Sequence, residues 1–525
     1  MAAILSPSAK QQFFTDAGLP AAGYRLFTYA ANTTTPQATY ANRAGTVANS
    51  NPIILNARGE ATVYLTPGVM YDYQFVSQDG SQVWTQEDVS ADAGDSNAVV
   101  FTQAGVGAIQ RSSQDKMREL VSVKDFGATG DGTTDDTPFI QAAINAFAAT
   151  GFGCLYFPRG VYRITSSLTI SFNGKVYGDG IGASVIRLDT ANQNGLVLAY
   201  SGYLAVRDLE FTAGVTKILG AGIRVEGLGG SAASQTLITN CRFQAQYIGI
   251  EMANAGYWTI KDCRFFEPVQ FGIFVDNTQN YDAGDNLIMG NTLQKTALTS
   301  TSAGIQQVAS GGTKVIGNKI LGFDRGYALI PRVGALSVID TQLVGNSIED
   351  GNTGIFIQTA NTGTAVGQMT ITGNQMSNKT NGIVLIGAAA GISIGDNQIA
   401  CNFASHIAVY MDSMNGSPSQ VILADNQISG NSSAGSVGIY AGNLANVKLA
   451  DNQISGCATP YANTTNTILR GFELPYSLLP GGGLAASNAG NGSYGYVIDG
   501  TTANPVAGGG TGCFARRLNG MWVGT

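Results

Sequence analysis

A four-residue pattern that recurs about every 26 residues constrains the fold of this chain more than any other feature. The copies read NCRF, DCRF, GNTL, GNKI, GNSI, GNQM and, three times, DNQI, and their second residues are Cys241, Cys263, Asn291, Asn318, Asn346, Asn374, Asn397, Asn426 and Asn452. A repeat of roughly 20–50 residues is typical of solenoids, in which each unit buries its apolar face against the next. The sequence therefore predicts one long repeat structure in place of several globular domains.

Glycine marks a second position with the same period. Short apolar stretches such as IFVD and IFIQ follow Gly222, Gly249, Gly272, Gly304, Gly326, Gly354, Gly382, His406 and Gly438, where His406 replaces glycine. The two patterns interleave, so each repeat contains at least two strands, and parallel stacking at ~4.8 Å per coil aligns inward Ile and Val side chains into ladders. Asn side chains in one column can pass amide hydrogen bonds from coil to coil, with Cys241 and Cys263 in the same column. We therefore predict an all-β fold, a parallel β-helix.

One convincing amphipathic helix precedes these repeats, in the stretch VKDFGATGDGTTDDTPFIQAAINAF at residues 123–147. Asp136 or Thr137 can cap the helix, and Pro138 suits its first turn, where a missing N–H costs nothing. Its expected apolar face comprises Phe139, Ala143, Ile144 and Phe147. The open end of a β-helix exposes strand edges that invite aggregation. We therefore predict that this helix covers the N-terminal end of the β-helix.

The rest of the chain divides into three further segments. Residues 1–95 contain runs that alternate apolar and polar side chains, two of them joined through Asp79 and Gly80, which indicates a small β domain with a hairpin. Residues 96–121 carry a weak helical pattern marked by Ile109, Met117 and Leu120, as expected of a neck or linker. The β-helix with its capping helix then spans 122–460. Residues 461–525 are expected to form a C-terminal cap or a trimerisation segment.

Composition excludes several classes of function. Charged residues make up 12% of the chain against roughly 25% in typical soluble proteins, and the net charge is -7 with no cluster of Lys and Arg, so we expect no nucleic-acid partner. The N-terminus lacks a signal-peptide pattern and no run of 18 apolar residues occurs, so we expect neither secretion through a signal peptide nor membrane insertion. Six widely spaced cysteines contain no CxxC pair. We therefore expect no metal, no cofactor and no disulfide framework.

Outward carboxylates concentrate on three consecutive coils. Strand side chains alternate, so the second and fourth residues after each glycine point outward, which places Arg224, Glu226, Glu251, Phe274 and Asp276 on the surface. A shift of one coil and two residues separates Glu226 from Glu251, and Glu251 from Asp276, by ~8 Å between Cα atoms. Inverting glycosidases hold two carboxyl groups ~6.5–9.5 Å apart. We predict a hydrolytic site in which Glu251 is the general acid, Glu226 or Asp276 activates water, and mutual repulsion raises the proton affinity of the acid.

The same region is rich in aromatic side chains, which are platforms for sugar rings. Together with Arg224, the expected substrate-binding residues are Tyr257, Trp258, Phe274 and Tyr281, whereas Phe265 falls in the inward ladder. The structural alternative is that Arg224 pairs with Glu251 and the aromatic rings only seal loops. Asp282 and Asp285 lie in the insertion NTQNYDAGDN, either as solvated turn residues or as carboxylates brought onto substrate by a loop.

Three other groups are poorer candidates for catalysis. Asp396, Asp425 and Asp451 repeat in DNQI, which favours turn hydrogen bonds over chemistry. The column Gln375, Gln398, Gln427 and Gln453 predicts an amide ladder. His406 is the single histidine and Ser405 is its chain neighbour, pointing to the opposite face, so a Ser-His-Asp esterase is not expected.

Three stretches resemble known proteins. VSVKDFGATGDGTTDDTPFIQAAINAF followed by CLYFPRGVYRIT resembles the start of the right-handed β-helices of the pectate-lyase superfamily. FTQAGVGAIQRSSQDKMREL is similar to the neck of bacteriophage tailspike proteins, and NPIILNARGEATVYLTPGVMYDYQFVSQDGSQVWTQEDV resembles their virion-attachment domain.

The resemblance implies a right-handed, single-stranded β-helix assembled as a homotrimer on a phage tail. Such a tailspike is a virion protein, assembled in the host cytoplasm and attached to tail, baseplate or adaptor proteins through its N-terminal domain. It binds a bacterial surface polysaccharide (capsule, O-antigen or exopolysaccharide) and usually cleaves it. Two alternatives stay open: a receptor-binding spike without enzyme activity, and a polysaccharide lyase that uses Tyr or Lys as its base. The resemblance does not identify the active site, because these proteins place it differently on one scaffold.

Overall fold

The chain forms two compact units, Met1–Leu120 and Val121–Thr525, each described below by itself. The structure is a computed structural model. It describes residues 4–5, 11–66, 68–90, 99–147, 151–199, 202–227, 234–276, 284–331, 338–359, 366–387, 389–412, 419–442, 447–462, 494–497, 513–518 and 521–524.

Antiparallel strands build the first unit. Its main sheet has the order β4 (Ile53–Ile54), β3 (Arg25–Ala30), β7 (Tyr71–Val76) and β8 (Gln82–Val89). Two smaller pairs are β1 (Ile4–Leu5) with β6 (Tyr64–Leu65), and β2 (Gln11–Gln12) with β5 (Glu60–Ala61). Strands β7 and β8 pair across the turn that contains Gly80, whose φ of 93° suits glycine, so the predicted hairpin is confirmed.

The segment before the second unit has ordered elements but little core of its own. It consists of β9 (Val100–Phe101), β10 (Arg111–Ser112) and helix α1 (Ser113–Met117), which buries no residue. Its large apolar side chains are exposed, namely those of Val106, Ile109, Met117 and Leu120. A two-stranded hairpin and one turn of helix are too small to be stable alone, so this segment depends on contacts beyond those it makes with itself.

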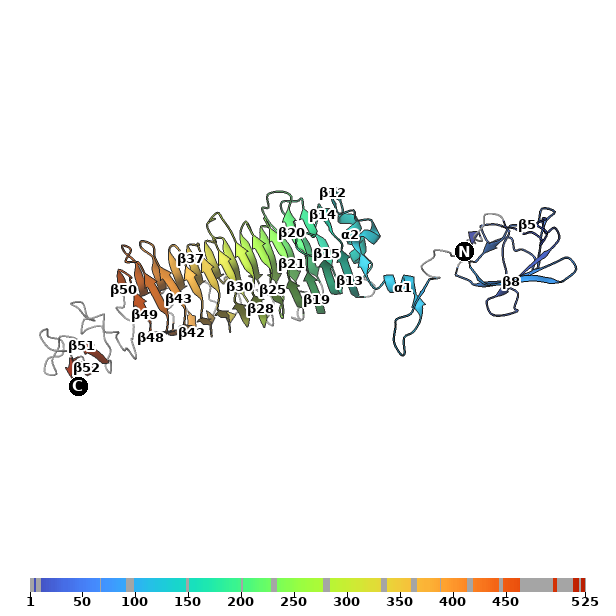
Figure 1. Cartoon of the computed structure of the whole chain (residues 1–525). Helices are drawn as coiled ribbons and strands as arrows, with labels where there is room; N and C mark the ends of the chain where they lie inside the picture. Colours follow the sequence, from blue (N-terminus) through green and yellow to red (C-terminus); the bar gives the residue numbers. More distant parts are fainter. Residues whose placement is uncertain are drawn as a thin grey trace. The chain divides into compact units, whose positions relative to one another are not determined.

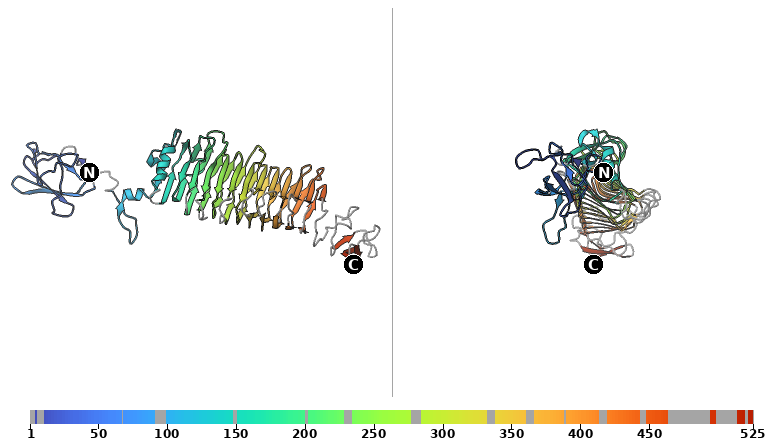
Figure 2. Two further views of the ribbon diagram at one scale, coloured as in Figure 1. Left: turned by 180° about the vertical axis from the view of Figure 1, so that it is seen from behind. Right: turned by 90° about the vertical axis from the view of Figure 1, so that its right-hand side faces the viewer.

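Three parallel sheets run along the second unit, so each full coil contributes three strands (Figures 1 and 2). Sheet 1 comprises β11 (Val121–Ser122), β13 (Phe152–Phe157), β16 (Asn173–Gly178), β19 (Gly202–Arg207), β22 (Ser234–Thr239), β25 (Thr259–Lys261), β28 (Asn286–Met289), β31 (Thr313–Ile316), β34 (Val338–Ile339), β35 (Gln342–Val344), β38 (Val366–Gly367), β39 (Thr370–Thr372), β42 (Ala389–Gly395), β45 (Ser419–Ala424) and β48 (Val447–Ala450).

Sheets 2 and 3 complete the coils. Sheet 2 comprises β12 (Asp131–Asp135), β14 (Gly160–Ile164), β17 (Ser184–Leu188), β20 (Glu210–Ala213), β23 (Arg242–Gln244), β26 (Arg264–Phe266), β29 (Thr292–Gln294), β32 (Lys319–Leu321), β36 (Ser347–Glu349), β40 (Gln375–Ser377), β43 (Gln398–Cys401), β46 (Gln427–Gly430) and β49 (Gln453–Ser455). Sheet 3 comprises β15 (Leu168–Ile170), β18 (Leu196–Ala199), β21 (Ala221–Glu226), β24 (Ile248–Ala253), β27 (Phe271–Asp276), β30 (Ala303–Ala309), β33 (Arg325–Leu329), β37 (Thr353–Gln358), β41 (Asn381–Ile386), β44 (Ile407–Asp412), β47 (Val437–Ala441) and β50 (Thr459–Ala462). A separate antiparallel sheet contains β51 (Tyr494–Val497), β52 (Cys513–Leu518) and β53 (Met521–Gly524).

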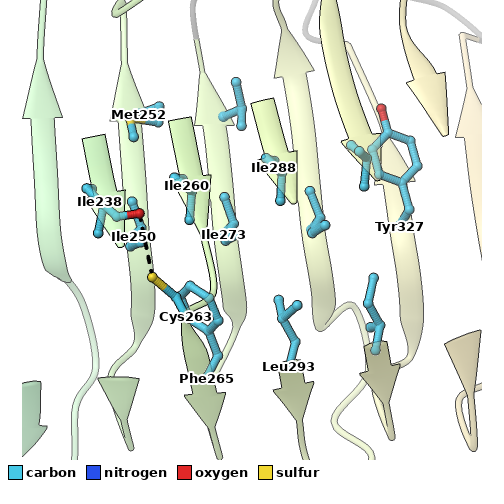
Figure 3. Close-up of a cluster of buried hydrophobic side chains, with 14 of the residues drawn as sticks. Ile238, Ile250, Met252, Ile260, Cys263, Phe265, Ile273, Ile288, Leu293 and Tyr327 are labelled. Atoms are coloured by element: carbon cyan, nitrogen blue, oxygen red, sulfur yellow. Dashed lines mark hydrogen bonds between the residues drawn. The ribbon is translucent and has the colours of Figure 1, made fainter. Parts of the chain in front are cut away.

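The interior of the second unit is one continuous apolar core. Side chains at equivalent positions stack from coil to coil, as Ile250 and Ile273 do in sheet 3 (Figure 3). The rings of Phe211, Phe243 and Phe265 stack in sheet 2 with centroids 5.1 and 4.9 Å apart. The predicted ladders, including the inward position of Phe265, are therefore confirmed.

The predicted asparagine ladder is also confirmed. Asn346 is buried, accepts hydrogen bonds from the backbone N and Nδ2 of Asn318, both at 3.0 Å, and donates from Nδ2 to Val315 O and Asn374 Oδ1, both at 2.9 Å. At the N-terminal end of the ladder, the Sγ of Cys263 takes the donor role toward the carbonyl of Ile238 at 3.7 Å. This column thus provides hydrogen-bond partners for buried backbone groups at one corner of each coil, between sheets 1 and 2, from Cys263 to Asn452.

Backbone conformation explains the repeated aspartates beside this ladder. Asp396, Asp425 and Asp451 have φ angles of 55°, 58° and 52°, in the left-handed region that only Gly, Asn and Asp adopt readily. Gly290 and Gly317 fill the same corner in earlier coils, with φ of 67° and 63°. The DNQI aspartates are therefore turn residues, as the preferred interpretation predicts.

The glycine pattern needs one correction. Strand β41 pairs with β44 so that Asn381 lies beside Ile407, which places Ala408, not His406, in register with Gly382. His406 lies two residues earlier and is fully buried. The position tolerates a methyl group in this coil, so glycine there is a preference and not a requirement.

Helix α2 (Thr137–Asn145) lies at the N-terminal end of the second unit, beside β12 and β15 (Figure 1). Its buried face comprises Ile140, Ala143 and Ile144, which belong to the main core. Phe147 follows the helix and contacts the ring of Phe172 at 4.9 Å. Phe139 is 37% exposed, so its expected place on the apolar face is wrong, because the face is centred on Ile140 and recurs three and four residues later.

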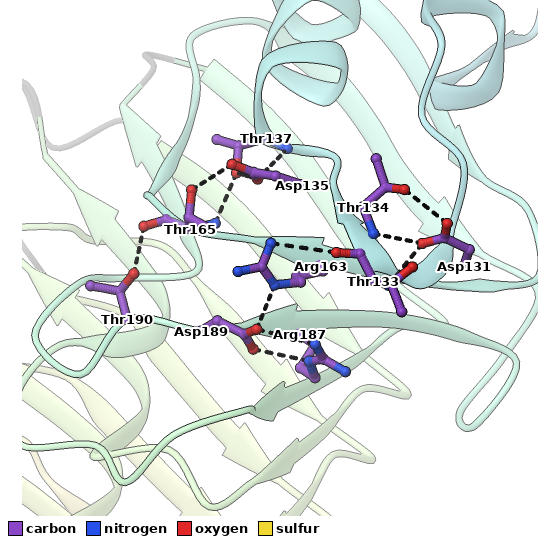
Figure 4. A network of polar contacts seen from close by, with 10 residues as sticks. All are labelled: Asp131, Thr133, Thr134, Asp135, Thr137, Arg163, Thr165, Arg187, Asp189 and Thr190. Carbon is purple, nitrogen blue, oxygen red and sulfur yellow. Dashed lines mark hydrogen bonds and ion pairs between the residues drawn. The ribbon is translucent and has the colours of Figure 1, made fainter.

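The glycine- and aspartate-rich stretch before α2 forms a polar network. Asp131 accepts hydrogen bonds from the backbone N atoms of Thr133 and Thr134, both at 2.8 Å, which lower the pKa of its carboxyl (Figure 4). Asp136 is buried and accepts from the backbone N of Thr129 at 2.8 Å, so it holds the preceding loop and does not cap the helix through its side chain. This network fixes the path of the chain into the first coil.

A search of the described residues for a helix both long and apolar enough to cross a membrane finds none.

Candidate functional site

The predicted carboxylates lie on neighbouring strands of sheet 3. In register, Arg224 of β21 pairs with Glu251 of β24, and Glu251 with Phe274 of β27. Ala253 separates Glu226 from Asp276 in the adjacent column. The side chains that alternate with them along the strands, such as Val225 and Met252, are fully buried in the core. The expected alternation, and the offset of one coil and two residues, are both present.

Arg224 bridges two of the carboxylates. Its Nε lies 2.8 Å from Glu226 Oε1, and its Nη1 lies 2.5 Å from Glu251 Oε1. Burial lowers the pKa of Arg224, but the charges and hydrogen bonds of Glu251 and Glu226 outweigh burial and raise it above its usual value. Exposed fractions of 31% for the Arg224 side chain, 41% for Glu226 and 13% for Glu251 leave the cluster open to solvent on one side. The alternative pairing of Arg224 with Glu251 is therefore present, and Glu226 shares it.

This bridge changes the expected electrostatics. Neighbouring carboxylates without a cation between them were expected at Glu226 and Glu251, whereas the structure places the Arg224 guanidinium in contact with both. The ion pair with Arg224 therefore holds the carboxylate of Glu251 in a fixed orientation.

Two of the expected sugar platforms are wrong. Trp258 is fully buried in the main core, where its Nε1 donates to Ala255 O at 3.0 Å, so no ring face is left for a ligand. Phe274 points outward but is only 8% exposed, because it stacks on Phe271 at 5.1 Å and packs with Ile248 and Val308. These rings seal the surface beside the carboxylates.

Tyr257 keeps the exposure that a platform needs. It is 46% exposed and has a φ of 56°, and its backbone N donates to Gly284 O at 3.0 Å. Tyr281 and Asp282 lie outside the described residues. Asp285 has a φ of 56°, which fits the interpretation as a turn residue.

A β-bulge follows the carboxylate cluster. Val275 pairs with Gln307, but Asp276 pairs with Ala309, so β30 carries one extra residue beside the last carboxylate. Bulges of this kind re-aim side chains and are over-represented next to active sites. The bulge therefore separates the charged coils from those that follow.

Two polar side chains inside the β-helix accompany this bulge, and the sequence interpretation missed both. Gln307 and Tyr327 occupy inward positions that Ile, Val, Met and Leu fill in neighbouring coils. They bond to each other, with Tyr327 Oη donating to Gln307 Oε1 at 2.7 Å, and Gln307 Nε2 donating to Ser310 O at 3.0 Å. A glutamine at an inward position of AGIQQVA is the signal that could have identified them.

Buried ionisable groups elsewhere have structural roles. Lys217 is 1% exposed and its Nζ donates to Thr190 O and Gln193 O at 2.6 and 2.7 Å, which ties one coil corner to the previous one, while burial lowers its pKa to about 8. His406 has no hydrogen-bond partner on either ring nitrogen, and burial lowers its pKa to about 4. No group of three or more His, Cys, Asp or Glu side chains placed to hold a metal ion occurs in the part of the chain that the structure describes.

Comparison with protein families identifies the fold. Residues 120–204 match the family "Rhamnogalacturonase A/epimerase, pectate lyase-like", and residues 175–327 and 221–399 match "Right handed beta helix region". The second unit is therefore a pectate-lyase-like right-handed parallel β-helix. The first match ends before Arg224, so it does not reach the carboxylate cluster.

Individual relatives match only short segments. Mannuronan C5-epimerase AlgE1 of Azotobacter vinelandii is 45% identical over 86 residues, which is 14% of this chain and 6% of that protein. Alginate lyase 7 of the same organism is 47% identical over 74 residues, 13% of this chain and 9% of that protein. The matched segment thus spans less than a tenth of either relative.

Solved structures share the fold over a longer range. The A-module of mannuronan C-5 epimerase AlgE6 from Azotobacter vinelandii has a TM-score of 0.55 at 20% identity, covering 66% of this chain and 97% of that one. The Dettilon tailspike protein has a TM-score of 0.55 at 16% identity, covering 68% of this chain and 71% of that one. At these identities the likeness establishes the architecture alone.

Proposed function

We propose that this protein is a phage tailspike whose β-helix binds a polysaccharide of the host surface and hydrolyses it on the outer face of sheet 3. The charged cluster on β21, β24 and β27 carries this proposal. Arg224, Glu226, Glu251 and Asp276 lie there, whereas the same outward positions of β30, β37 and β41 hold uncharged side chains. Folding alone does not need such a concentration of charge on one face.

The arrangement suits a two-carboxylate hydrolysis. Glu251 and Asp276 lie one coil and two residues apart, which corresponds to ~8 Å between their Cα atoms and leaves room for a water molecule, as in inverting enzymes. Arg224 contacts Glu251 and fixes its orientation, so Glu251 is assigned as the base that activates water and Asp276 as the acid that protonates the glycosidic oxygen. This assignment reverses the acid role first expected of Glu251. Arg224 and the exposed ring of Tyr257 contact the substrate.

Amide variants test these roles. Glu251→Gln and Asp276→Asn keep the shape of each side chain and remove its ionisable group, so turnover is expected to fall by ~10²–10⁴-fold while polysaccharide binding persists. Asp396→Asn is the matched control, because asparagine also tolerates the left-handed backbone at that corner. Full activity of both site variants would place the chemistry elsewhere on the β-helix.

One assay separates hydrolysis from its rivals. The protein is incubated with host polysaccharide while molecular mass, new reducing ends and ultraviolet absorbance of unsaturated sugars are followed. A hydrolase lowers the mass and creates reducing ends, a lyase also raises the absorbance, and a receptor-binding spike without activity does neither. The lyase is the second candidate, because alginate lyase 7 is among the relatives.

The first unit is proposed to attach the spike to the tail, baseplate or adaptor proteins of the virion, and the chain to form a homotrimer. The exposed apolar side chains of Val106, Ile109, Met117 and Leu120 support an assembly in which identical segments cover one another. A chain that begins at residue 100 is expected to remain a trimer and to bind polysaccharide, measured by light scattering and by a binding assay. Loss of binding by a folded trimer would contradict this division.

A further inference from the structure

Two pairs of arginines in adjacent coils of sheet 2 differ in how their charges are balanced. Arg163 of β14 is in register with Arg187 of β17, and Arg242 of β23 is in register with Arg264 of β26. Like charges directly opposite each other on neighbouring strands are destabilising. Each pair therefore needs an anion.

The first pair has its anion within the chain. Asp189 accepts from Arg163 Nε at 2.6 Å and from Arg187 Nε and Nη2 at 2.9 and 3.1 Å, so one carboxylate neutralises both guanidinium groups (Figure 4). Asp189 follows Arg187 by two residues and projects from the same face of the sheet. This triad shows how the scaffold satisfies an arginine pair.

The second pair lacks such a carboxylate. The residue two positions after Arg264 is Phe266, which is 36% exposed and lies 6.0 Å from the Arg242 guanidinium. Arg242 is 3.8 Å from Glu210 on its other side, and exposed Arg264 has no ion pair among the described residues. An aromatic ring thus occupies the place that corresponds to Asp189.

The surface around this pair is suited to a chain-like ligand. Thr292 and Lys319 continue the column of Arg242 and Arg264 on β29 and β32, and both are exposed. The outward positions of these four strands hold no carboxylate. Three coil steps separate Arg242 from Lys319, a span of ~14 Å that exceeds a single sugar.

We propose that β23, β26, β29 and β32 bind an acidic polysaccharide, with a sugar carboxylate between Arg242 and Arg264 and a sugar ring against Phe266. The carboxylate takes the role that Asp189 has between Arg163 and Arg187, and a further acidic sugar contacts Lys319. This site deepens the proposed function, on which it rests, by naming the substrate class as a polymer with carboxylated sugars. It lies on sheet 2, apart from the catalytic residues of sheet 3.

Binding is tested with the full chain and with polygalacturonate, polymannuronate and hyaluronate as probes, each beside its carboxyl-reduced, neutral form. At least one acidic polymer is expected to bind, more weakly at high salt, and its neutral form is expected not to bind. The variant Arg264→Ala with Lys319→Ala is expected to weaken binding roughly tenfold. The matched control, Lys175→Ala with Lys448→Ala, removes the same charge from exposed sites on sheet 1 and is expected to leave affinity unchanged.

A second variant tests the comparison with Asp189 directly. Phe266→Asp supplies an internal carboxylate to the arginine pair and is expected to abolish binding, with no loss of thermal stability. Phe266→Ala removes the ring without adding charge and is expected to weaken binding less. The proposal is overturned if none of the acidic polymers binds, if the neutral forms bind equally well, or if the control weakens binding as much as the double variant. If single-stranded DNA binds through the same residues more tightly than any acidic polysaccharide does, the surface is a nucleic-acid site and the proposal is also overturned.

These outcomes are distinct from those for the catalytic site. If Glu251→Gln abolishes turnover and the variants at Arg264, Lys319 and Phe266 leave polysaccharide binding unchanged, only the sheet 2 site is refuted. If the variants at Arg264, Lys319 and Phe266 weaken binding of an acidic polymer and no polymer is cleaved, the hydrolytic function is refuted and the sheet 2 binding site is supported.

Discussion

Replacing one asparagine of the internal ladder gives a sharp test of what holds the β-helix together. Asn346 lies in the middle of the ladder and is 2% exposed. Asn346→Leu has a similar volume but removes the acceptor of two buried donors on Asn318 and the donor to Val315 O and Asn374 Oδ1. Leaving a buried polar group without a partner costs about 1–3 kcal/mol.

The hydrogen bonds that Asn318, Val315 and Asn374 lose set the size of the expected effect. The backbone N of Asn318 loses its acceptor, Asn318 Nδ2 keeps its bond to Ile288 O but loses the one to Asn346, and Val315 O and Asn374 Oδ1 each lose one donor. A total of about 3–5 kcal/mol is expected after some local relaxation. Burial of the apolar leucine side chain at position 346 offsets about 1–2 kcal/mol of this lost stability. The net free energy of unfolding is therefore expected to fall by about 1–4 kcal/mol.

Guanidinium unfolding followed by circular dichroism measures this loss, with the unfolding rate as a second readout in case refolding is incomplete. Gln398→Leu is the control, because Gln398 belongs to the exposed column of the same coils. Asn346→Leu is expected to shift the midpoint clearly, and the control hardly at all. Equal midpoints for the two variants would show that the ladder hydrogen bonds contribute no more than surface amides, and would refute the argument.

Three further outcomes follow from buried side chains. Ile144→Asp places a charge in the core beneath α2 and is expected to cost several kcal/mol, whereas Phe139→Asp, at a 37% exposed position, is expected to be tolerated; equal melting temperatures would show that α2 does not cover the β-helix end. The pKa of His406 is lowered to about 4 in the folded chain against about 6.5 in an unfolded one, so the unfolded state binds more protons between these values, and stability is expected to fall by at most about 3 kcal/mol as pH drops from 6.5 to 4. His406→Phe is expected to remove that dependence, and an unchanged pH profile would contradict it. Tyr327→Phe leaves Gln307 Oε1 without its donor and is expected to cost about 1–3 kcal/mol in thermal or denaturant unfolding, part of which Gln307→Leu in the same chain restores; no cost would show that the pair is not coupled.

The sequence predicted the β-helix well because its repeat is set by local requirements. Each coil corner needs a left-handed residue followed by a buried donor and acceptor, and Gly, Asp and Asn are nearly the sole residues that satisfy the first requirement. The spacing of Asn291, Asn318 and Asn346 therefore reports the coil length directly. The predicted register was wrong at His406, because the glycine position requires only a small side chain. Ala408, two residues later, occupies that position in this coil.

The candidate site was harder to predict, because alternation gives direction and not surroundings. It placed Phe274 outward correctly, but it could not show that Phe271 and Ile248 cover the ring. Trp258 lies in a corner between strands, where alternation does not apply, and its burial depends on packing with the whole core. Pairing in register identified Arg224 as a neighbour of Glu251, yet the second contact with Glu226 depends on the side-chain conformation of the arginine.

In a β-helix, equivalent side chains of successive coils lie at one fixed spacing, which stabilises columns of neutral side chains and destabilises columns of like charges. Neutral side chains gain from identical neighbours, as the rings of Phe243 and Phe265 do, because stacked rings attract each other. Charged side chains lose from identical neighbours, and the β-helix balances them either by an opposite charge in register, as Glu251 does beside Arg224, or by one offset by two residues, as Asp189 is beside Arg187. Arg264 lies in register with Arg242 and has neither kind of carboxylate partner among the described residues. The like-charged pair of Arg242 and Arg264 is therefore the observation on which the proposed binding site of sheet 2 rests.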